Sequence, residues 1–423
     1  MDLREALRRG RRTERSSRRG EPIIVGMATT DFDSEAPLSG PPDPWESTSQ
    51  PSPRSGPPYH MTDMIAAEPA LAERVLGRLG LPDSGAARLA AAIREETRFG
   101  DPIVVTGCGT SEHGALGVAE IIGEAMADAG VAGPRPVAVQ AFELALDPPS
   151  SGLVIGISHE GATAATNRAL EAAREAGART AIVTVSDRSP GAALADVVVT
   201  TEELDQSWCH TVGYVSPLLA ATAVGAALRG EAADAAGIRR LMADGARDTA
   251  SAEAMAATLA DARHLIVIAS GADRTAGREL TLKIEEAAWV PTAYRDLETY
   301  LHGHLPANGD ATGLVLVLAD RRGRDDRSFR ARQALAAANV VGVRCAAIVS
   351  AGADTTLDAA STPAGRVVVP EATALPAAVA ALFGTATALQ LLTERIARAR
   401  GTNPDPIRRD DPRYLAASAR ADG

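Results

Sequence analysis

The strongest constraint on the fold is an order of segments that occurs twice along the chain. From residue 61 onward, short β-branched apolar runs alternate with segments of helical periodicity. Strands are expected at 102–106, 136–140, 152–157, 180–185 and 196–200, and then at 264–269, 313–319, 340–349 and 366–370. Each series opens with an apolar run that enters a glycine-containing turn, VVTGCGTSEHG in the first and VIASGADRTAG in the second. This order predicts two copies of a parallel sheet covered by helices on both faces.

The expected helices include two unusually apolar ones. Helices are expected at 61–79, 83–98, 111–130, 162–177, 211–228, 273–289, 327–338 and 374–398, with a long helical stretch at 233–262. The uncharged stretches 206–228 and 372–393 reach the ~20 residues that a membrane span needs. Both are rich in small residues, and each contains a proline. They therefore predict buried helices that pack closely, and we expect no membrane association.

The chain of 423 residues is long enough for two or three domains of ~150 residues. We expect α/β domains at 59–235 and 236–400, followed by a C-terminal tail at 401–423. Residues 1–58 are arginine-rich and then dominated by Pro, Ser, Gly and Asp, without an apolar period. They predict a disordered tail, unless Met27 or Met61 is the initiator.

Charge and cysteine content exclude several classes of protein. The net charge of −11 argues against a nucleic-acid partner, because that function needs a basic face. The three cysteines have no C-x-x-C spacing, so we expect neither a disulfide framework nor a zinc site. Residues 1–60 lack the apolar centre of a signal peptide, so secretion is not expected. These features predict a cytoplasmic protein that uses no metal and no other cofactor.

Lysine is almost absent from this arginine-rich chain. Of its 43 Lys and Arg residues, only Lys283 is a lysine. A solvated surface position accepts either cation, so the bias against lysine acts on all such positions. An ammonium retained against this bias is a candidate for chemistry that a guanidinium cannot perform, because its pKa is adjustable and it acts as a point charge. Chance retention is the alternative.

The turn after the first strand carries glycine and hydroxyl residues. Ligands of open parallel sheets bind at the carboxyl ends of the strands. Here Gly109 frees the backbone to approach a ligand, while Thr110 and Ser111 offer N–H and hydroxyl groups at a helix N-terminus. An ordinary capping role is the alternative for both hydroxyl residues.

A second turn has the sequence GISHEGAT, residues 156–163. Ser158, Gly161 and Thr163 form a further nest of donors at a helix start. The turn resembles the Ser-x-Ser-Gly-x-Thr phosphate loop of sugar isomerase (SIS) domains, and the resemblance extends through both halves of the chain. It implies two tandem SIS domains, each a flavodoxin-like three-layer sandwich, with His159 and Glu160 also in the substrate-binding loop.

Glu160 departs from the pattern of this loop. The family has a hydroxyl residue at the matching position, and that residue contacts phosphate. A carboxylate within ~4–6 Å of a phosphate is repelled unless it turns away or pairs with a cation. Either Glu160 points outward at the helix start, or the site has exchanged phosphate for a neutral or amine-bearing group.

A third segment contains Glu279, Lys283 and Glu286, and is followed by His302 and Gly303. It resembles the family's E-x-x-x-K-x-x-E segment and the H-G motif sixteen residues later. Lys283 and Glu286 are three residues apart and can share one site on a helix. The resemblance implies that Glu286 moves a proton between sugar carbons C1 and C2, that His302 assists ring opening, and that Lys283 holds the carboxylate and a substrate oxygen. A surface ion pair and a loop-capping histidine are the alternatives.

The tail sequence GTNPDP, residues 401–406, resembles the family's C-terminal signature. In glucosamine-6-phosphate synthase this signature is followed by a lysine that forms a Schiff base with the ketose. The matching position here is Ala417, so imine catalysis from the tail is not expected, although the tail can close over the site. Near the end of the first half, His210 and Thr211 either line the pocket or begin a helix.

Together, these features predict an enzyme that binds a sugar or sugar phosphate. The expected reaction is aldose–ketose isomerisation, or release of ammonia from an amino sugar, by acid–base proton transfer. No glutaminase segment precedes the first half, so glutamine-dependent amination is not expected. The resemblance implies a homodimer in which a second copy completes the site. The rival class is a non-catalytic sugar-phosphate sensor, which needs the binding turns but not Lys283, Glu286 and His302.

Overall fold

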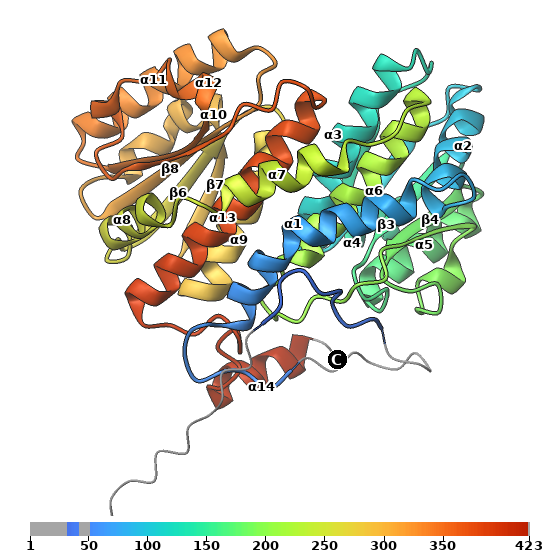
Figure 1. The fold of residues 1–423 in the computed structure, drawn as a ribbon, viewed down its shortest axis with the longest axis horizontal. Helices are drawn as coiled ribbons and strands as arrows, with labels where there is room; N and C mark the ends of the chain where they lie inside the picture. Colours follow the sequence, from blue (N-terminus) through green and yellow to red (C-terminus); the bar gives the residue numbers. More distant parts are fainter. Residues whose placement is uncertain (1–31, 42–50, 422–423) are drawn as a thin grey trace, which may run out of the picture. The chain divides into compact units, whose positions relative to one another are not determined.

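A computed structural model describes residues 32–41 and 51–421 of the chain. Residues Asp33–Gly423 form one compact unit, which contains two sheets and the helices around them (Figure 1). The arginine-rich start of the chain, with Met27, lies outside the described residues.

The first sheet has five parallel strands in the order β2-β1-β3-β4-β5. They are β1 (Ile103–Gly107), β2 (Val137–Gln140), β3 (Leu153–Ile157), β4 (Arg179–Thr184) and β5 (Val197–Thr200). The strands β1 and β3 are buried at every position, because helices cover both faces of the sheet. This is the flavodoxin-like order, in which ligands bind at the carboxyl ends of β1 and β3, where the strand order reverses.

The helices of the first half are α1 (His60–Leu79), α2 (Gly85–Thr97), α3 (Thr110–Asp128), α4 (Ala141–Leu146), α5 (Ala164–Ala176) and α6 (Val212–Arg229). The closest packing joins α3 to α6. A Cβ atom at Gly117 of α3 would lie 2.4 Å from a methyl carbon of Leu218 in α6. A side chain at position 117 would therefore displace the side chain of Leu218.

The second sheet repeats the topology of the first. Its parallel strands have the order β10-β9-β8-β6-β7, which is the same order as in the first sheet when counted from β6. They are β6 (His264–Ala269), β7 (Thr292–Asp296), β8 (Thr312–Leu318), β9 (Arg344–Ser350) and β10 (Arg366–Val369). The expected fold class of two parallel α/β units is confirmed.

The helices of the second half are α7 (Ala235–Gly245), α8 (Thr249–Leu259), α9 (Asp273–Ala288), α10 (Leu297–Thr299), α11 (Arg324–Val340), α12 (Ala351–Asp354), α13 (Ala377–Arg400) and α14 (Pro412–Ala421). Helix α13 packs against α9, α8 and α7. Both α6 and α13 are long and apolar enough to cross a membrane, but 89% and 94% of their apolar windows are buried within the chain. They are core helices, as their small residues predicted.

Two segments differ from the sequence-based expectation. Strand β7 was not expected, because it is an edge strand, TAYRD, that is half-buried throughout and lacks an apolar run. Residues 340–343 were assigned to a strand, but they form the end of α11 and a turn. Val340 is exposed and Gly342 has a φ of +81°, so the β-branched residues here belong to a helix end.

Two stretches within the segment expected to be disordered pack on the folded chain. The backbone N–H of buried Leu38 donates to Glu203 Oε2 at 3.0 Å, and Ser39 accepts a hydrogen bond from the backbone of Leu204. Further along, the backbone N–H of Arg54 donates to Asp405 Oδ2 at 3.1 Å. Residues 33–41 and 51–58 are thus attached to the folded unit, the second stretch to the C-terminal tail.

Candidate active site

The first turn depends on its glycines. Gly109 has φ +57° and ψ −128°, a conformation that side chains disfavour. At Gly107 a Cβ atom would lie 2.6 Å from the backbone of Ser111. The chain can therefore reverse tightly from β1 into α3, so that Thr110 and Ser111 open the helix beside a cavity.

The second turn joins β3 to α5 and is equally constrained. Gly161 has φ +68°, and a Cβ atom there would lie 2.1 Å from the hydroxyl of Ser189. Buried Ser158 donates a hydrogen bond to Thr163 Oγ1 at 3.3 Å. The Thr163 hydroxyl makes no capping bond to its own helix, so it is free to meet a ligand. Gly161 and Ser158 thus fix the shape of the turn without lining the cavity beside it.

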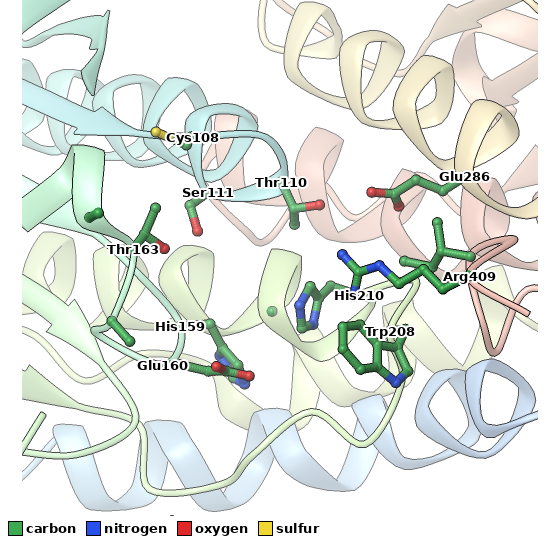
Figure 2. A pocket seen from close by; sticks show the side chains of 14 residues that line it. Cys108, Thr110, Ser111, His159, Glu160, Thr163, Trp208, His210, Glu286 and Arg409 are labelled. Carbon is green, nitrogen blue, oxygen red and sulfur yellow. The ribbon is translucent and has the colours of Figure 1, made fainter. Parts of the chain in front are cut away.

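The two turns form one wall of a cavity of about 630 Å³ (Figure 2). From these turns the cavity is lined by Thr110, Ser111, His159, Glu160 and Thr163. Of the eight predicted substrate-binding residues, Gly109, Ser158 and Gly161 do not line it. Glu160 belongs to the wall that a ligand meets.

The opposite wall comes from distant parts of the chain. It contains Trp208 and His210 from the segment before α6, Glu286 from α9, and Ile407 and Arg409 from the C-terminal tail. Figure 2 shows Glu286, Arg409 and Trp208 on one side and Ser111, Thr163 and Glu160 on the other. The cavity is therefore lined by both halves of the chain and by the tail.

Two histidines flank the buried carboxylate of Asp205. The backbone N–H of Asp205 donates to His159 Nε2 at 2.9 Å, so the ring proton of neutral His159 is on Nδ1. Burial, together with the nearby charge of His210, lowers the pKa of His159 to about 4, although Asp205 opposes this shift. Burial alone would also lower the pKa of His210, but Asp205, 3.5 Å away, outweighs burial and raises it. His159 is therefore a neutral donor, whereas Asp205 stabilises the charged form of His210.

Asp205 also organises the chain behind the cavity. Its Oδ2 accepts hydrogen bonds of 2.8 Å from the backbone N–H groups of Thr211 and Gly213 at the start of α6. Burial would raise the pKa of Asp205, but His210, His159 and the N–H of Gly213 outweigh burial and lower it. The segment stays fixed because the carboxylate is ionised. Of the pair weighed from the sequence, His210 lines the cavity and Thr211 does not.

Lys283 lies at the centre of a buried chain of charges. Its Nζ donates to Glu286 Oε2 at 2.5 Å and lies 3.7 Å from Glu279 Oε1, and its side chain is 0% exposed. Glu279 in turn lies 2.7 Å from His113 Nδ1 and accepts a bond of 3.4 Å from Thr110. Burial alone would lower the pKa of Lys283, but the carboxylates, Glu286 foremost, outweigh burial and raise it. The only lysine of the chain is thus a buried permanent cation.

Glu286 is the member of this chain of charges that meets the cavity. Its Oε2 is held by Lys283 and also accepts a bond of 3.6 Å from the thiol of buried Cys209. No described residue donates a hydrogen bond to its other oxygen, Oε1. The pairing of Lys283 with Glu286, which their spacing allowed, is present and leaves one carboxylate oxygen available to a ligand.

His302 does not join this constellation within one chain. Its side chain is 68% exposed, and its Nε2 lies 2.7 Å from Glu298, which also binds Arg330. It stands in a turn with non-helical geometry at His302 and Gly303, and it does not line the cavity. The structure therefore brings together Glu286 and Lys283 but not His302.

The sequence reasoning missed Arg409. This residue follows the tail signature, and its guanidinium lies 4.2 Å from the centre of the Trp208 ring. Nothing in the tail sequence marks Arg409 among the chain's 42 arginines, because its position depends on how the tail folds back. Ala417, the position that matches the family's imine-forming lysine, is exposed on α14. Among the described residues, no group of three His, Cys, Asp or Glu side chains is placed to hold a metal ion.

Residues 101–228 match the family model of the SIS domain, so the resemblance is confirmed for the first half of the chain. The C-terminal domain of glucosamine-fructose-6-phosphate aminotransferase from Francisella tularensis is 17% identical, with a TM-score of 0.70 over 83% of this chain and 99% of that domain. Tagatose-6-phosphate ketose/aldose isomerase from Escherichia coli is 16% identical, with a TM-score of 0.66 over 85% and 98%. Glucosamine-6-phosphate deaminase from Thermotoga maritima is 16% identical, with a TM-score of 0.61 over 82% and 97%.

These identities are low, so the structural likeness shows the fold: two SIS-like α/β units in tandem. Among curated protein sequences, none matches this chain. The three solved structures span almost their whole length on this chain, so the tandem arrangement itself is shared.

Proposed function

We propose that this SIS-domain protein is a sugar isomerase that moves a proton between C1 and C2 of an open-chain sugar, with Glu286 as the base. The observation that carries the proposal is the environment of this carboxylate. Lys283 and Cys209 hold Oε2, Oε1 has no described donor, and the Glu286 side chain lines the cavity. A base needs this arrangement, since one oxygen must be fixed and the other must reach the substrate.

The proton transfer starts from the open-chain aldose. Glu286 takes the proton from C2, the C–H electron pair forms the C1=C2 bond, and the carbonyl electron pair moves onto O1 to give an enediolate. The proton of O2 then passes to O1, and Glu286 returns its proton to C1, which gives the ketose. Lys283 keeps Glu286 oriented throughout the transfer, because its buried ammonium holds Oε2 of the carboxylate at 2.5 Å.

The wall formed by the two turns would bind the rest of the sugar. Ser111 and Thr163 offer hydroxyl groups, and His159 offers its Nδ1 proton. Glu160 lines the same wall, and its carboxylate favours a hydroxyl or an amine over a phosphate at this position. We therefore include 2-amino sugars among the candidate substrates. For these the proton transfer from C2 to C1 gives an imine at C2, which water hydrolyses to the ketose and ammonia.

Ring opening would need a group that one copy of the chain does not place in the cavity. The exposed position of His302 suits a homodimer in which the partner subunit's His302 reaches the cavity. The resemblance to the family supports this arrangement. Measurement of the molar mass in solution, followed by mixing of inactive Glu286→Gln and His302→Ala variants, tests it. Activity regained on mixing supports a shared site.

The second candidate function is a sugar sensor without catalysis in a cytoplasmic regulator. The absence of His302 from the cavity of the single chain favours it. The test is incubation in deuterated water with fructose 6-phosphate, glucosamine 6-phosphate and their unphosphorylated forms. Exchange at C1 or C2 supports the isomerase, whereas binding of a sugar without any exchange supports the sensor. Released ammonia would identify a deaminase.

A further inference from the structure

The tail places one cation in the cavity, and the reaction proposed above does not yet use it. Of the described residues that line the cavity, Arg409 is the only one with a permanent positive charge. It makes no ion pair with any described carboxylate, and its one side-chain contact of note is the ring of Trp208. A guanidinium that lines a cavity without a carboxylate partner is complementary to a negative charge brought by a ligand.

The backbone of the tail holds this cation in place. Ile407 and Arg408 have φ values of +45° and +60°, which side chains adopt only at a cost. This strained turn sends neighbouring arginines in different directions. The guanidinium of Arg408 lies 4.7 Å from the ring centre of Trp289 and 4.0 Å from that of Tyr414, which anchors the tail outside the cavity. Arg409 is thereby left to face the cavity from the Trp208 ring.

The position of the Arg409 guanidinium relative to Glu286 indicates which part of the ligand would carry the negative charge that it contacts. Figure 2 shows the Arg409 guanidinium and the Glu286 carboxylate on the same side of the cavity, away from Ser111, Thr163 and Glu160. Glu286 must lie next to C1 and C2, so the oxygens on these carbons are the ligand atoms nearest to this wall. Those oxygens are neutral in the substrate and carry a full negative charge in the enediolate.

We propose that Arg409, supported by Trp208, is a catalytic residue that donates hydrogen bonds to the enediolate oxygen formed when Glu286 removes the proton. This inference rests on the proposed function. The guanidinium lies over the indole, 4.2 Å from the ring centre, and its N–H groups donate to no described side chain, so they can donate to a ligand. The tail thus supplies charge stabilisation rather than the amine for an imine, which fits a chain whose only lysine is buried on α9.

The test compares Arg409→Gln and Arg409→Lys with Arg413→Gln. Arg413 makes a good control because it carries the same charge on the same tail, is 82% exposed and pairs with Asp411 outside the cavity. Steady-state constants are measured with whichever sugar the wild type turns over. The second readout is the affinity for arabinonate and arabinonate 5-phosphate, whose carboxylate imitates the enediolate.

Arg409→Gln is expected to lower kcat by about 100-fold, the usual cost of one oxyanion donor, with KM changed less than about threefold. Its affinity for the aldonate should fall by a similar factor, Arg409→Lys should keep part of the activity, and Arg413→Gln should match the wild type. A higher KM with unchanged kcat would mean that Arg409 binds an anionic group of the substrate itself, which overturns the proposal. Unchanged constants in Arg409→Gln would overturn it as well. If the wild type exchanges no proton with any sugar, the proposed function fails first.

Discussion

Replacement of Lys283 by methionine tests the buried charge network most severely. Methionine has a similar volume and no charge, so the change removes the cation while leaving the packing of α9 nearly intact. The ammonium lies 2.5 Å from Glu286 and 3.7 Å from Glu279. At an effective dielectric constant of ~20 these distances correspond to attractions of about 7 and about 4 kcal/mol. The cost of burying the charged lysine offsets part of this attraction.

The net loss of stability in Lys283→Met comes from the carboxylates that lose their cation. Glu279 is fully buried and would keep only His113 and Thr110 as partners, whereas Glu286 is partly exposed and can recover water. Leaving one buried charge unpaired costs ~3–5 kcal/mol, and we expect that loss in the free energy of unfolding. For a unit the size of Asp33–Gly423, about 4 kcal/mol corresponds to a midpoint of thermal unfolding lower by about 5 °C.

The assay is urea unfolding followed by circular dichroism, with the double variant Lys283→Met/Glu279→Gln as the matched comparison. Since the second change removes the stranded carboxylate, the double variant should regain most of the lost stability. A loss below about 1 kcal/mol in Lys283→Met would refute the reasoning. So would a double variant that is less stable than the single one, because the charges would then not be coupled.

Two further predictions concern the wall formed by the turns. The pKa of His159 is about 4 in the folded chain and about 6.5 when unfolded, so the unfolded chain binds more protons between these values and the stability falls as the pH drops from 6.5 to 4. That loss of stability is about 3 kcal/mol. Urea unfolding across this pH range should show it in the wild type and not in His159→Gln. If the free energies of unfolding of the two proteins changed with pH in parallel, the low pKa of His159 would be contradicted. Glu160→Ser restores the hydroxyl of the family's loop, and its KM should fall for a phosphorylated sugar relative to the free sugar. An unchanged ratio would mean that Glu160 does not face the ligand.

The fold was predictable because buried parallel strands carry their own signal. An apolar run such as 152–157 can lie only between two layers of helices, and the glycine-rich turns after such runs gave the start of each unit. Strand β7 escaped notice because it pairs on one side alone and is half-buried, so its sequence carries no apolar run. Strands were therefore predicted best where the sheet buries them on both faces.

The site was predictable where its residues are close in sequence or follow neighbouring strands of one sheet, as Ser111 and Thr163 do. The pairing of Lys283 with Glu286 follows from their spacing on one helix. Arg409 and Trp208 are about two hundred residues apart in sequence, and they meet only because the tail folds back to the cavity. No local sequence pattern encodes this contact. For the same reason, the position of His302 relative to the cavity could not be derived from the motif that contains it.

The most direct test of the central claim is proton exchange by Glu286→Gln. The matched control is Glu285→Gln, since Glu285 is exposed, neighbours Glu286 on the same helix and does not line the cavity. With a sugar that the wild type deuterates at C1 or C2, we predict that Glu286→Gln loses at least about 100-fold of the exchange rate and that Glu285→Gln keeps it. Exchange by Glu286→Gln at the wild-type rate would show that another group is the base.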